Sequence, residues 1–271
     1  MPQAPIVLDS ITRMDESYRG KVLVAASHGG VYAAYLAALG RLRGVILNDA
    51  GVGRDEAGIG GLAYLERAGM AAATISHLSA RIGDGADMMA RGVISHVNDR
   101  ARDVGCEPGM ACADCAARLA DAPPLERDPP PVEEARFLLR AEPGEPEVWG
   151  IDSNSLVTPD DGDRILITGS HGQFLGDRPE TAIKYDVVAA VYNDAGCGID
   201  GAGTSRLPAL DARGIAAATV SHMSARIGEA RSTYEDGILS HVNETAAAAG
   251  ARPGMTVAAF VDRVAEAQRK T

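Results

Sequence analysis

The stretch AAATISHLSARIG at residues 71–83 occurs again as AAATVSHMSARIG at residues 216–228, with two conservative differences. Each copy begins as a short apolar run and ends in a polar phrase, which is typical of a buried strand that leads into a loop. A second shared phrase, Asn-Asp-Ala-Gly, follows an apolar run at residues 48–51 and again at residues 193–196. The chain is therefore a tandem duplication of a unit that contains buried strands.

Extending this pattern predicts alternating strands and helices. Strands are expected at Ile6–Asp9, Val22–Ser27, Val45–Asp49 and Ala71–Ser76, and in the second copy at Val148–Asp152, Ile165–Ser170, Val187–Asn193 and Ala216–Ser221. Helices are expected at Val31–Leu42, Gly58–Ala68, Ala86–Val104 and Met110–Leu119. Such alternation indicates right-handed crossovers and mainly parallel sheets. The predicted fold class is α/β, with two Rossmann-like three-layer units in tandem.

The two copies differ at one helix and are joined by a proline-rich segment. Val31–Leu42 has no recognisable match in Phe174–Asp186, which contains Pro179. We expect a first repeat at residues 1–121, a linker at 122–146, where prolines exclude regular helix, and a second repeat at 147–271.

Composition favours a small-molecule ligand. The net charge of −11 argues against nucleic acid and anionic membranes as partners, because both require a basic surface. No apolar run approaches the length of a membrane span, and the first residues lack the pattern of a signal peptide, so a cytoplasmic location is expected. Apolar residues on the outer faces of the predicted helices, together with the general frequency of symmetric dimers, favour a homo-oligomer over a monomer.

All six histidines occur in matched pairs, and four of them follow predicted strands. His28, Asp49 and His77 lie at three strand ends of the first copy, and His171, Asp194 and His222 lie at the same places in the second. The carboxyl ends of parallel strands share one edge of a sheet, where open α/β folds bind ligands. These six residues are the predicted catalytic groups. The aspartates could instead form turns, and the Ser-His phrases could cap helices.

The same six residues allow two chemistries. Two imidazoles and a carboxylate can hold a divalent transition metal such as Zn, Fe or Mn and leave positions open for water. They can equally act as a metal-free acid and base steered by a carboxylate. No nucleotide cofactor is expected, because neither copy contains the Gly-x-Gly-x-x-Gly pattern or a P-loop lysine.

Further matched residues are predicted to bind substrate. Arg81 and Arg226 could hold an anionic group, or could form structural ion pairs with nearby acids. The amides of Gly29 and Gly172 could bind a single oxygen at a helix start. The remaining candidates lie beside these groups: Ser27, Ser170, Asn48 and Asn193. Asp9-Ser10 and Asp152-Ser153 close the first strand of each copy, either as supporting hydrogen-bonding groups or as turns.

The cysteines and the last histidine pair are interpreted as structural. Cys106, Cys112 and Cys115 align with apolar residues of the other copy, which is typical of buried thiols. Cys197 also aligns with an apolar residue, Val52, but lies in a loop close to the candidate groups. His96 and His241 are placed within the predicted long helix of each copy, beside its buried face.

In general plan, two similar α/β units in tandem resemble the amino-acid racemase type of enzyme, in which the substrate lies between domains. That family uses a cysteine in each half, whereas Val52 stands opposite Cys197 here, so no residue role is transferred. We expect a hydrolase that acts on a small polar metabolite, anionic or amide-bearing, with water activated by His and Asp or by a metal. The alternatives are a cofactor-free lyase or isomerase with one histidine from each repeat, and a non-catalytic binding protein.

Overall fold

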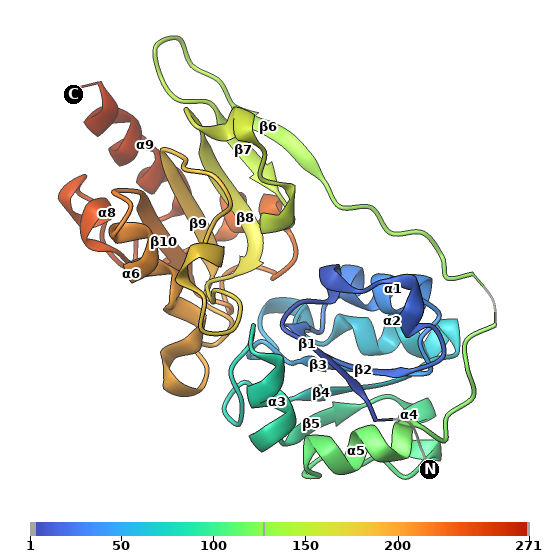
Figure 1. The fold of residues 1–271 in the computed structure, drawn as a ribbon. Coiled ribbons are helices and arrows are strands. Elements are labelled where there is room, and N and C mark those ends of the chain that lie inside the picture. The colour runs from blue at the N-terminus through green and yellow to red at the C-terminus, as the bar shows by residue number, and fades with distance from the viewer. Residues whose placement is uncertain (1–3, 127, 270–271) are drawn as a thin grey trace.

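The computed structural model describes residues 4–126 and 128–269 and shows two α/β units (Figure 1). In the first sheet each strand lies next to its neighbours in the sequence: β1 (Ile6–Leu8), β2 (Val22–His28), β3 (Gly44–Asn48), β4 (Ala71–Ile75) and β5 (Ile94–Val97). The first four strands are parallel, and β5 is antiparallel to β4. This confirms a mainly parallel sheet in the first unit.

The second sheet has the same order and one additional edge strand. Its strands are β6 (Arg136–Arg140), β7 (Val148–Ile151), β8 (Ile165–His171), β9 (Ala189–Asn193), β10 (Ala216–Val220) and β11 (Leu239–Val242). Strands β7 to β10 are parallel, whereas β6 and β11 run antiparallel at the two edges. Part of the predicted linker, residues 136–140, therefore belongs to the second sheet.

Helices cover both faces of each sheet, so each unit has three layers (Figure 1). In the first unit α1 (Val31–Leu39) and α2 (Gly60–Ala68) lie on one face, and α3 (Gly85–Arg91) and α5 (Cys112–Leu119) lie on the other, with the short α4 (Asp99–Asp103) after β5. The second unit contains α6 (Arg206–Asp211), α7 (Ala230–Asp236), α8 (Glu244–Ala248) and α9 (Val257–Gln268).

The central strands are apolar throughout because both of their faces are covered. Val22 and Val24 of β2 pack toward α5, whereas Leu23 and Ala25 pack toward α1 and α2. All four side chains are fully or almost fully buried. A strand buried on both sides loses the alternation of polar and apolar residues, which explains the uninterrupted apolar runs of the sequence.

The predicted helix at Ala86–Val104 is wrong. The chain forms α3, then the edge strand β5, and then α4. Gly92 leaves the helical conformation at the end of α3, with φ −62° and ψ 137°, and packs against the Met88 carbonyl, where a methyl group would lie 2.4 Å from the oxygen. Residues 94–97 pair with the free edge of β4 and form a strand, although their apolar residues are spaced as in a helix. His96 and His241 therefore lie on edge strands, and not in helices.

The mismatch between the copies is confirmed in the structure. Where the first unit has α1, the second has an irregular segment with one 3-10 turn at Pro179–Thr181. Pro179 stands at the first position of this turn, and the loop before it, residues 172–178, contains no helix.

The segment between the units lies against the first one. Leu125 is buried among the side chains of α1 and α2, and Val132 packs on the same cluster. The Tyr64 hydroxyl donates to the Pro130 carbonyl, and Arg41 binds Asp128. The described residues on either side of residue 127 are thus held against the first unit.

The two units meet through the matched Asn-Asp-Ala-Gly loops. A methyl group on Gly51 would lie 2.9 Å from the Cα atom of Gly196, and one on Gly196 would lie 3.0 Å from Cα of Gly51. Around this point Ala50, Ile82, Ala195 and Ile227 form a small buried cluster with members from both units. The contact is symmetric, so an approximate twofold axis passes between the two glycines.

Two equivalent backbone hydrogen bonds extend this contact. The amide of Arg54 donates to the His222 carbonyl at 2.8 Å, and the amide of Ile199 donates to the His77 carbonyl at 2.8 Å. Ion pairs lie farther out, between Arg91 and Asp200 at 2.7 Å and between Arg226 and Asp55 at 3.0 Å. The carboxyl edges of the two sheets consequently face each other.

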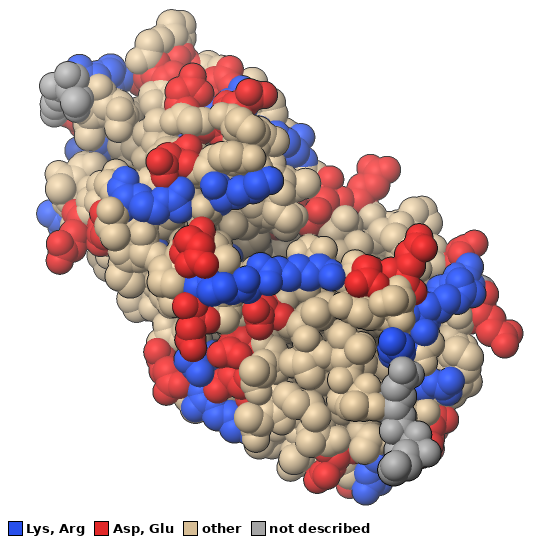
Figure 2. All heavy atoms as spheres, in the orientation of Figure 1, with Lys and Arg blue, Asp and Glu red and all other residues tan. Residues whose placement is uncertain are grey.

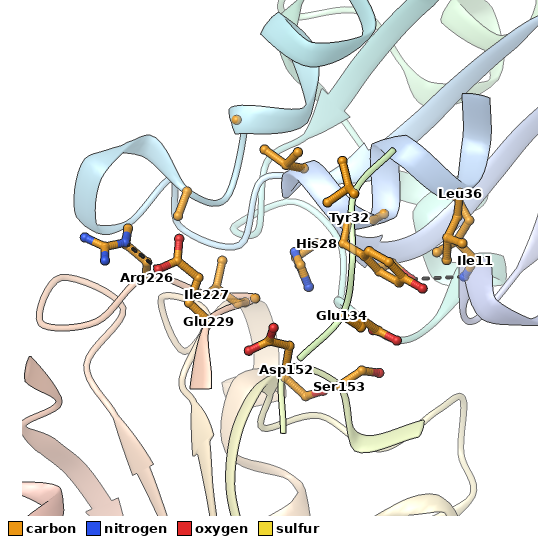
Figure 3. A pocket seen from close by; sticks show the side chains of 18 of the residues that line it. Ile11, His28, Tyr32, Leu36, Glu134, Asp152, Ser153, Arg226, Ile227 and Glu229 are labelled. Atoms are coloured by element: carbon orange, nitrogen blue, oxygen red, sulfur yellow. Dashed lines mark hydrogen bonds and ion pairs between the residues drawn. The ribbon is translucent and has the colours of Figure 1, made fainter. Parts of the chain in front are cut away.

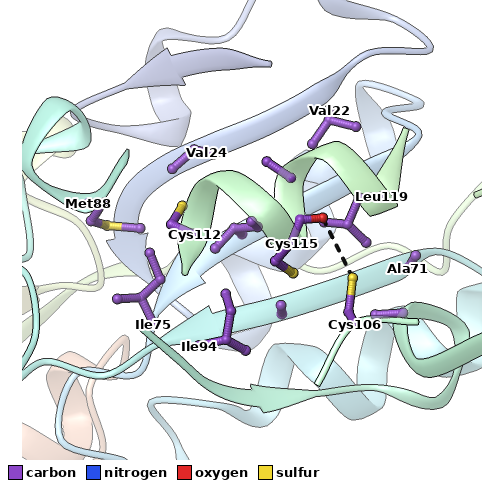
Figure 4. Close-up of a cluster of buried hydrophobic side chains, with 14 of the residues drawn as sticks. Val22, Val24, Ala71, Ile75, Met88, Ile94, Cys106, Cys112, Cys115 and Leu119 are labelled. Atoms are coloured by element: carbon purple, nitrogen blue, oxygen red, sulfur yellow. Dashed lines mark hydrogen bonds between the residues drawn. The ribbon is translucent and has the colours of Figure 1, made fainter. Parts of the chain in front are cut away.

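Three cysteines are part of the core, as predicted (Figure 4). Cys106, Cys112 and Cys115 are buried among Val24, Ile75 and their neighbours. Burial raises the pKa of Cys112 to about 12, so this thiol is inert at neutral pH. Cys197 differs from them because it is only half-buried.

None of the helices within the described residues is sufficiently long and apolar to cross a membrane.

The glycine contact at the axis predicts a specific sensitivity. Gly51→Ala is expected to lower the free energy of unfolding by about 1–3 kcal/mol more than Gly109→Ala. Both glycines have positive φ, 77° and 92°, but a methyl group on Gly109 meets nothing within 4 Å. The control therefore carries the same kind of backbone cost without the clash. Urea denaturation followed by circular dichroism measures both values, and equal losses would contradict the tight contact.

Candidate functional site

A cavity of about 380 Å³ lies between the two units (Figure 3). Its wall combines the end of β2 and helix α1 of the first unit with the ends of β7 and β8 and the loop before α7 of the second. Residues 132–134 of the connecting segment close one side. Both carboxyl sheet edges therefore contribute to a single cavity.

His28 stands at the centre of this wall (Figure 3). It ends β2, and its ring approaches the second unit closely, since a methyl group on Gly228 would lie 3.3 Å from its Cε1 atom. Its Nδ1 atom accepts the N–H of Gly30 at 3.2 Å, so the proton of the neutral ring is on Nε2. Burial lowers the pKa of His28 to about 4. At neutral pH the ring is thus an uncharged hydrogen-bond donor.

His171 occupies the matching position at the end of β8 and also reaches the cavity wall. It is 7% exposed, and its Nδ1 accepts the N–H of Gln173 at 3.3 Å. Burial, followed by the positive charge of Arg206 and the nearness of His28, lowers the pKa of His171 well below its ordinary value. Neither histidine takes up a proton readily near pH 7.

Carboxylates dominate the charged groups of the cavity. Glu134 and Asp152 line the same cavity as His28, and Glu133, Glu229 and Asp55 complete the acidic set. Burial raises the pKa of Glu134, and the negative charge of Asp152 raises it further, whereas the Ser153 and Tyr32 hydroxyls act in the opposite direction. Burial and Glu134 together raise the pKa of Tyr32.

Backbone amides hold Asp152 in place. Its Oδ1 accepts the N–H of Ala230 at 2.9 Å, and its Oδ2 accepts the N–H of Ala135 at 2.8 Å. The Asp152 amide in turn donates to the Ala135 carbonyl at 3.0 Å. These bonds fix the carboxylate beside Glu134 and tie the connecting segment to the second unit.

The symmetry-related position is closed. Asp9 is the counterpart of Asp152. Its Oδ2 accepts a hydrogen bond from the Arg178 guanidinium at 2.9 Å, whereas Oδ2 of Asp152 accepts a backbone N–H. The amide of Gly176 donates to the Gly83 carbonyl at 2.8 Å, which seats residues 173–178 against the first unit. The segment that replaces helix α1 thus covers this position, and an open surface hollow lined by Asp9, Arg81 and Asp84 lies beside Arg178.

Asp49 and His77 form a hydrogen-bonded pair, as do Asp194 and His222. The Nδ1–Oδ1 distances are 2.8 Å and 3.0 Å. Burial acts to raise the pKa of Asp49, but hydrogen bonds from His77 outweigh it and hold the pKa below its ordinary value. His77 lies against Gly196, and His222 lies against Gly51, so both pairs belong to the contact between the units.

The six predicted catalytic residues are therefore divided between two places. His28 and His171 reach the cavity, and the two Asp–His pairs lie at the seam between the units. Among the described residues, His28 does not form a group of mutually close ligand atoms with Asp49 and His77, nor does His171 with Asp194 and His222.

The predicted substrate-binding residues have structural partners. Arg81 pairs with Asp87 at 3.2 Å, and Arg226 pairs with Glu229 at 2.8 Å. The Ser27 hydroxyl accepts the N–H of Ile11, and Ser170 accepts that of Asn154, while both line the cavity. Asn48 and Asn193 each bind the backbone of the loop that follows them, and the amides of Gly29 and Gly172 donate to the carbonyls of these two asparagines.

The search for matched pairs missed Glu134 and Tyr32. Glu134 precedes β6, which has no equivalent in the first unit, and Tyr32 lies on α1, which has none in the second. The sequence offers only the pair of acidic residues Glu133-Glu134 after the proline-rich segment as a signal.

Comparison of the chain with protein-family models, curated proteins and solved structures finds no match. Figure 2 shows acidic and basic side chains interspersed over one face of both units, with short rows of basic side chains near the line where the units meet.

The lowered pKa of His28 predicts how it titrates. Its Cε1 proton signal, assigned with His28→Gln, is expected to shift with a midpoint near pH 4 in an NMR titration. Because the unfolded chain binds this proton first, stability should fall as the pH drops from about 6.5 to about 4, by about 1–3 kcal/mol more in the wild type than in His28→Gln. A midpoint near pH 6.5 would contradict burial of the ring.

Proposed function

We propose that the protein is a hydrolase of a small, amide-bearing polar molecule, with water activated by carboxylates in the cavity between the units. The observation that carries this proposal is the group formed by Glu134, Asp152 and His28, which joins two acids with a neutral donor in one enclosed space. A cavity in which burial raises the pKa of one acid, here Glu134, beside a second carboxylate is typical of acid–base catalysis.

The three groups suit different steps. Asp152, oriented by two backbone amides, accepts a proton from water as the water oxygen attacks the amide carbon. The Nε2–H of His28 donates to the carbonyl oxygen as negative charge develops there. Glu134, whose burial favours the protonated form, gives its proton to the leaving nitrogen. The C–N bond breaks, and a carboxylic acid and an amine are released.

The charge of the cavity narrows the substrate class. Arg226 is its one arginine among the described lining residues, and it already pairs with Glu229 and Asp55. An anionic substrate would therefore meet net negative charge. An amide that also bears an amino or other cationic group fits better than the anionic alternative that the sequence left open.

The geometry supports two other mechanisms less well than activation of water by carboxylates: activation by a metal ion bound to the six predicted ligands, and proton transfer by the two cavity histidines. The six predicted ligands do not converge on one point, and both cavity histidines are held neutral by burial. A lyase or isomerase that uses one histidine from each unit as acid and base would require at least one ring that ionises near neutral pH.

A reaction screen in isotopically labelled water tests the class of reaction. Small amides with and without a cationic group are incubated with the protein in H₂¹⁸O, and products are followed by mass spectrometry. Hydrolysis predicts one ¹⁸O atom in the released carboxylic acid. Turnover without ¹⁸O would indicate a lyase or isomerase, and tight binding without turnover would indicate a binding protein.

Matched variants test the residues. Asp152→Asn and Glu134→Gln are each expected to lower kcat by about 100-fold or more. Asp9→Asn, the same change at the equivalent position of the first unit, should leave kcat within a factor of about 3, since Asp9 does not line the cavity that contains Glu134 and Asp152. Activity should fall with rising pH as Glu134 loses its proton, and Glu134→Gln should remove that limb. Equal effects at Asp9 and Asp152 would contradict the assignment.

A further inference from the structure

Three potential metal ligands converge outside the cavity, in the second unit. Asp194, Cys197 and His241 each offer one ligand atom, and these atoms all lie within 4.8 Å of one another. Asp194 and Cys197 come from the loop after β9, whereas His241 comes from the edge strand β11. None of the three belongs to the described residues that line the cavity.

Asp194 is already oriented by its neighbours. Its Oδ1 accepts the N–H of Gly196 at 3.0 Å, the N–H of His222 at 2.9 Å and the Nδ1–H of His222 at 3.0 Å. These three bonds all go to Oδ1. The Asp194 side chain also lies within hydrogen-bonding reach of the Ser240 hydroxyl and of the Cys197 thiol, which places it directly against a second candidate ligand. Ligands fixed by such supporting hydrogen bonds are typical of metal sites in proteins.

We propose that Asp194, Cys197 and His241 form a binding site for a zinc-type transition-metal ion. A thiolate, an imidazole and a carboxylate together suit Zn²⁺, whereas Mg²⁺ and Ca²⁺ prefer oxygen ligands alone. Three protein ligands leave one tetrahedral position for water. His241 is exposed and Cys197 is half-buried, which gives the ion a path from solvent.

The first unit supplies a natural comparison. Asp49 accepts the same three hydrogen bonds, but Val52 stands where the second unit has Cys197. The two residues share an unusual backbone conformation, with φ 61° for Val52 and 59° for Cys197. Valine is thus compatible with this loop, and the difference between the units is the thiol. We therefore expect one site per chain.

Zinc binding to the full-length protein tests the site. The wild type is dialysed against buffered Zn²⁺ and measured by elemental analysis, alongside Cys197→Val and Cys112→Val. Each variant replaces a cysteine by the valine that stands at the equivalent position of the other copy, Val52 for Cys197 and Val257 for Cys112. Cys112 is the control because it lies in the hydrophobic core, away from the proposed site. One zinc per chain is expected for the wild type and Cys112→Val. Loss of a supporting group alone weakens metal sites by about 10–100-fold, so Cys197→Val should weaken binding by more than about 100-fold.

Cobalt supplies an independent readout of the thiolate ligand. Co²⁺ bound to the wild type and to Cys112→Val should show a sulfur-to-metal charge-transfer band that Cys197→Val lacks, with circular dichroism confirming that all three proteins are folded. Absence of zinc from the wild type would overturn the proposal. Equal zinc affinity in Cys197→Val would overturn it as well, as would loss of zinc in Asp152→Asn, because the ion would then lie in the cavity.

Discussion

The structure depends on the contact between Gly51 and Gly196, where the two loops lie too close together for a side chain on either residue. Because the loops follow equivalent strands, this contact brings the carboxyl edges of both sheets together about an approximate twofold axis. The matched histidines His77 and His222 then extend the seam through their carbonyls. The matched histidines at these edges are consequently divided: His77 and His222 belong to the contact between the units, and His28 and His171 reach the cavity beside it.

An exact twofold axis would produce two equivalent cavities. The two copies differ in sequence, and the cavity that contains His28 forms on one side of the axis. In the first unit, helix α1 lines the cavity and leaves room in front of His28. In the second, residues 173–178 occupy the equivalent space, and Arg178 neutralises Asp9. The segment in which the copies diverge therefore makes the two positions different, and our proposal places one composite site in the chain.

Much of the fold could be predicted from the sequence, because strands buried on both faces produce unmistakable apolar runs. The edge strands β5 and β11 could not, since one side of an edge strand is open and its spacing resembled that of a helix. Two of the three histidine pairs, His28 with His171 and His77 with His222, were correctly placed at strand ends, but the sequence did not distinguish their roles. Local patterns do not show which strand ends become the seam between the two units.

Comparison of the two copies does not identify all residues of the candidate site, and the reason is physical. Residues that both copies share preserve what both copies need, which is the sheet, its loops and the contact at the axis. Glu134 and Tyr32 have no counterparts, yet they supply a carboxyl group and a hydroxyl to the cavity between the units. In a duplicated chain with one cavity, residues that occur in only one copy can therefore belong to the site.

The central claim, one composite cavity per chain, is tested most directly by the stoichiometry of ligand binding. Isothermal titration calorimetry with a substrate amide, or with its slowly hydrolysed analogue, is expected to give one bound molecule per chain. Two equivalent molecules per chain would show that residues 173–178 do not close the second position, and would contradict the account.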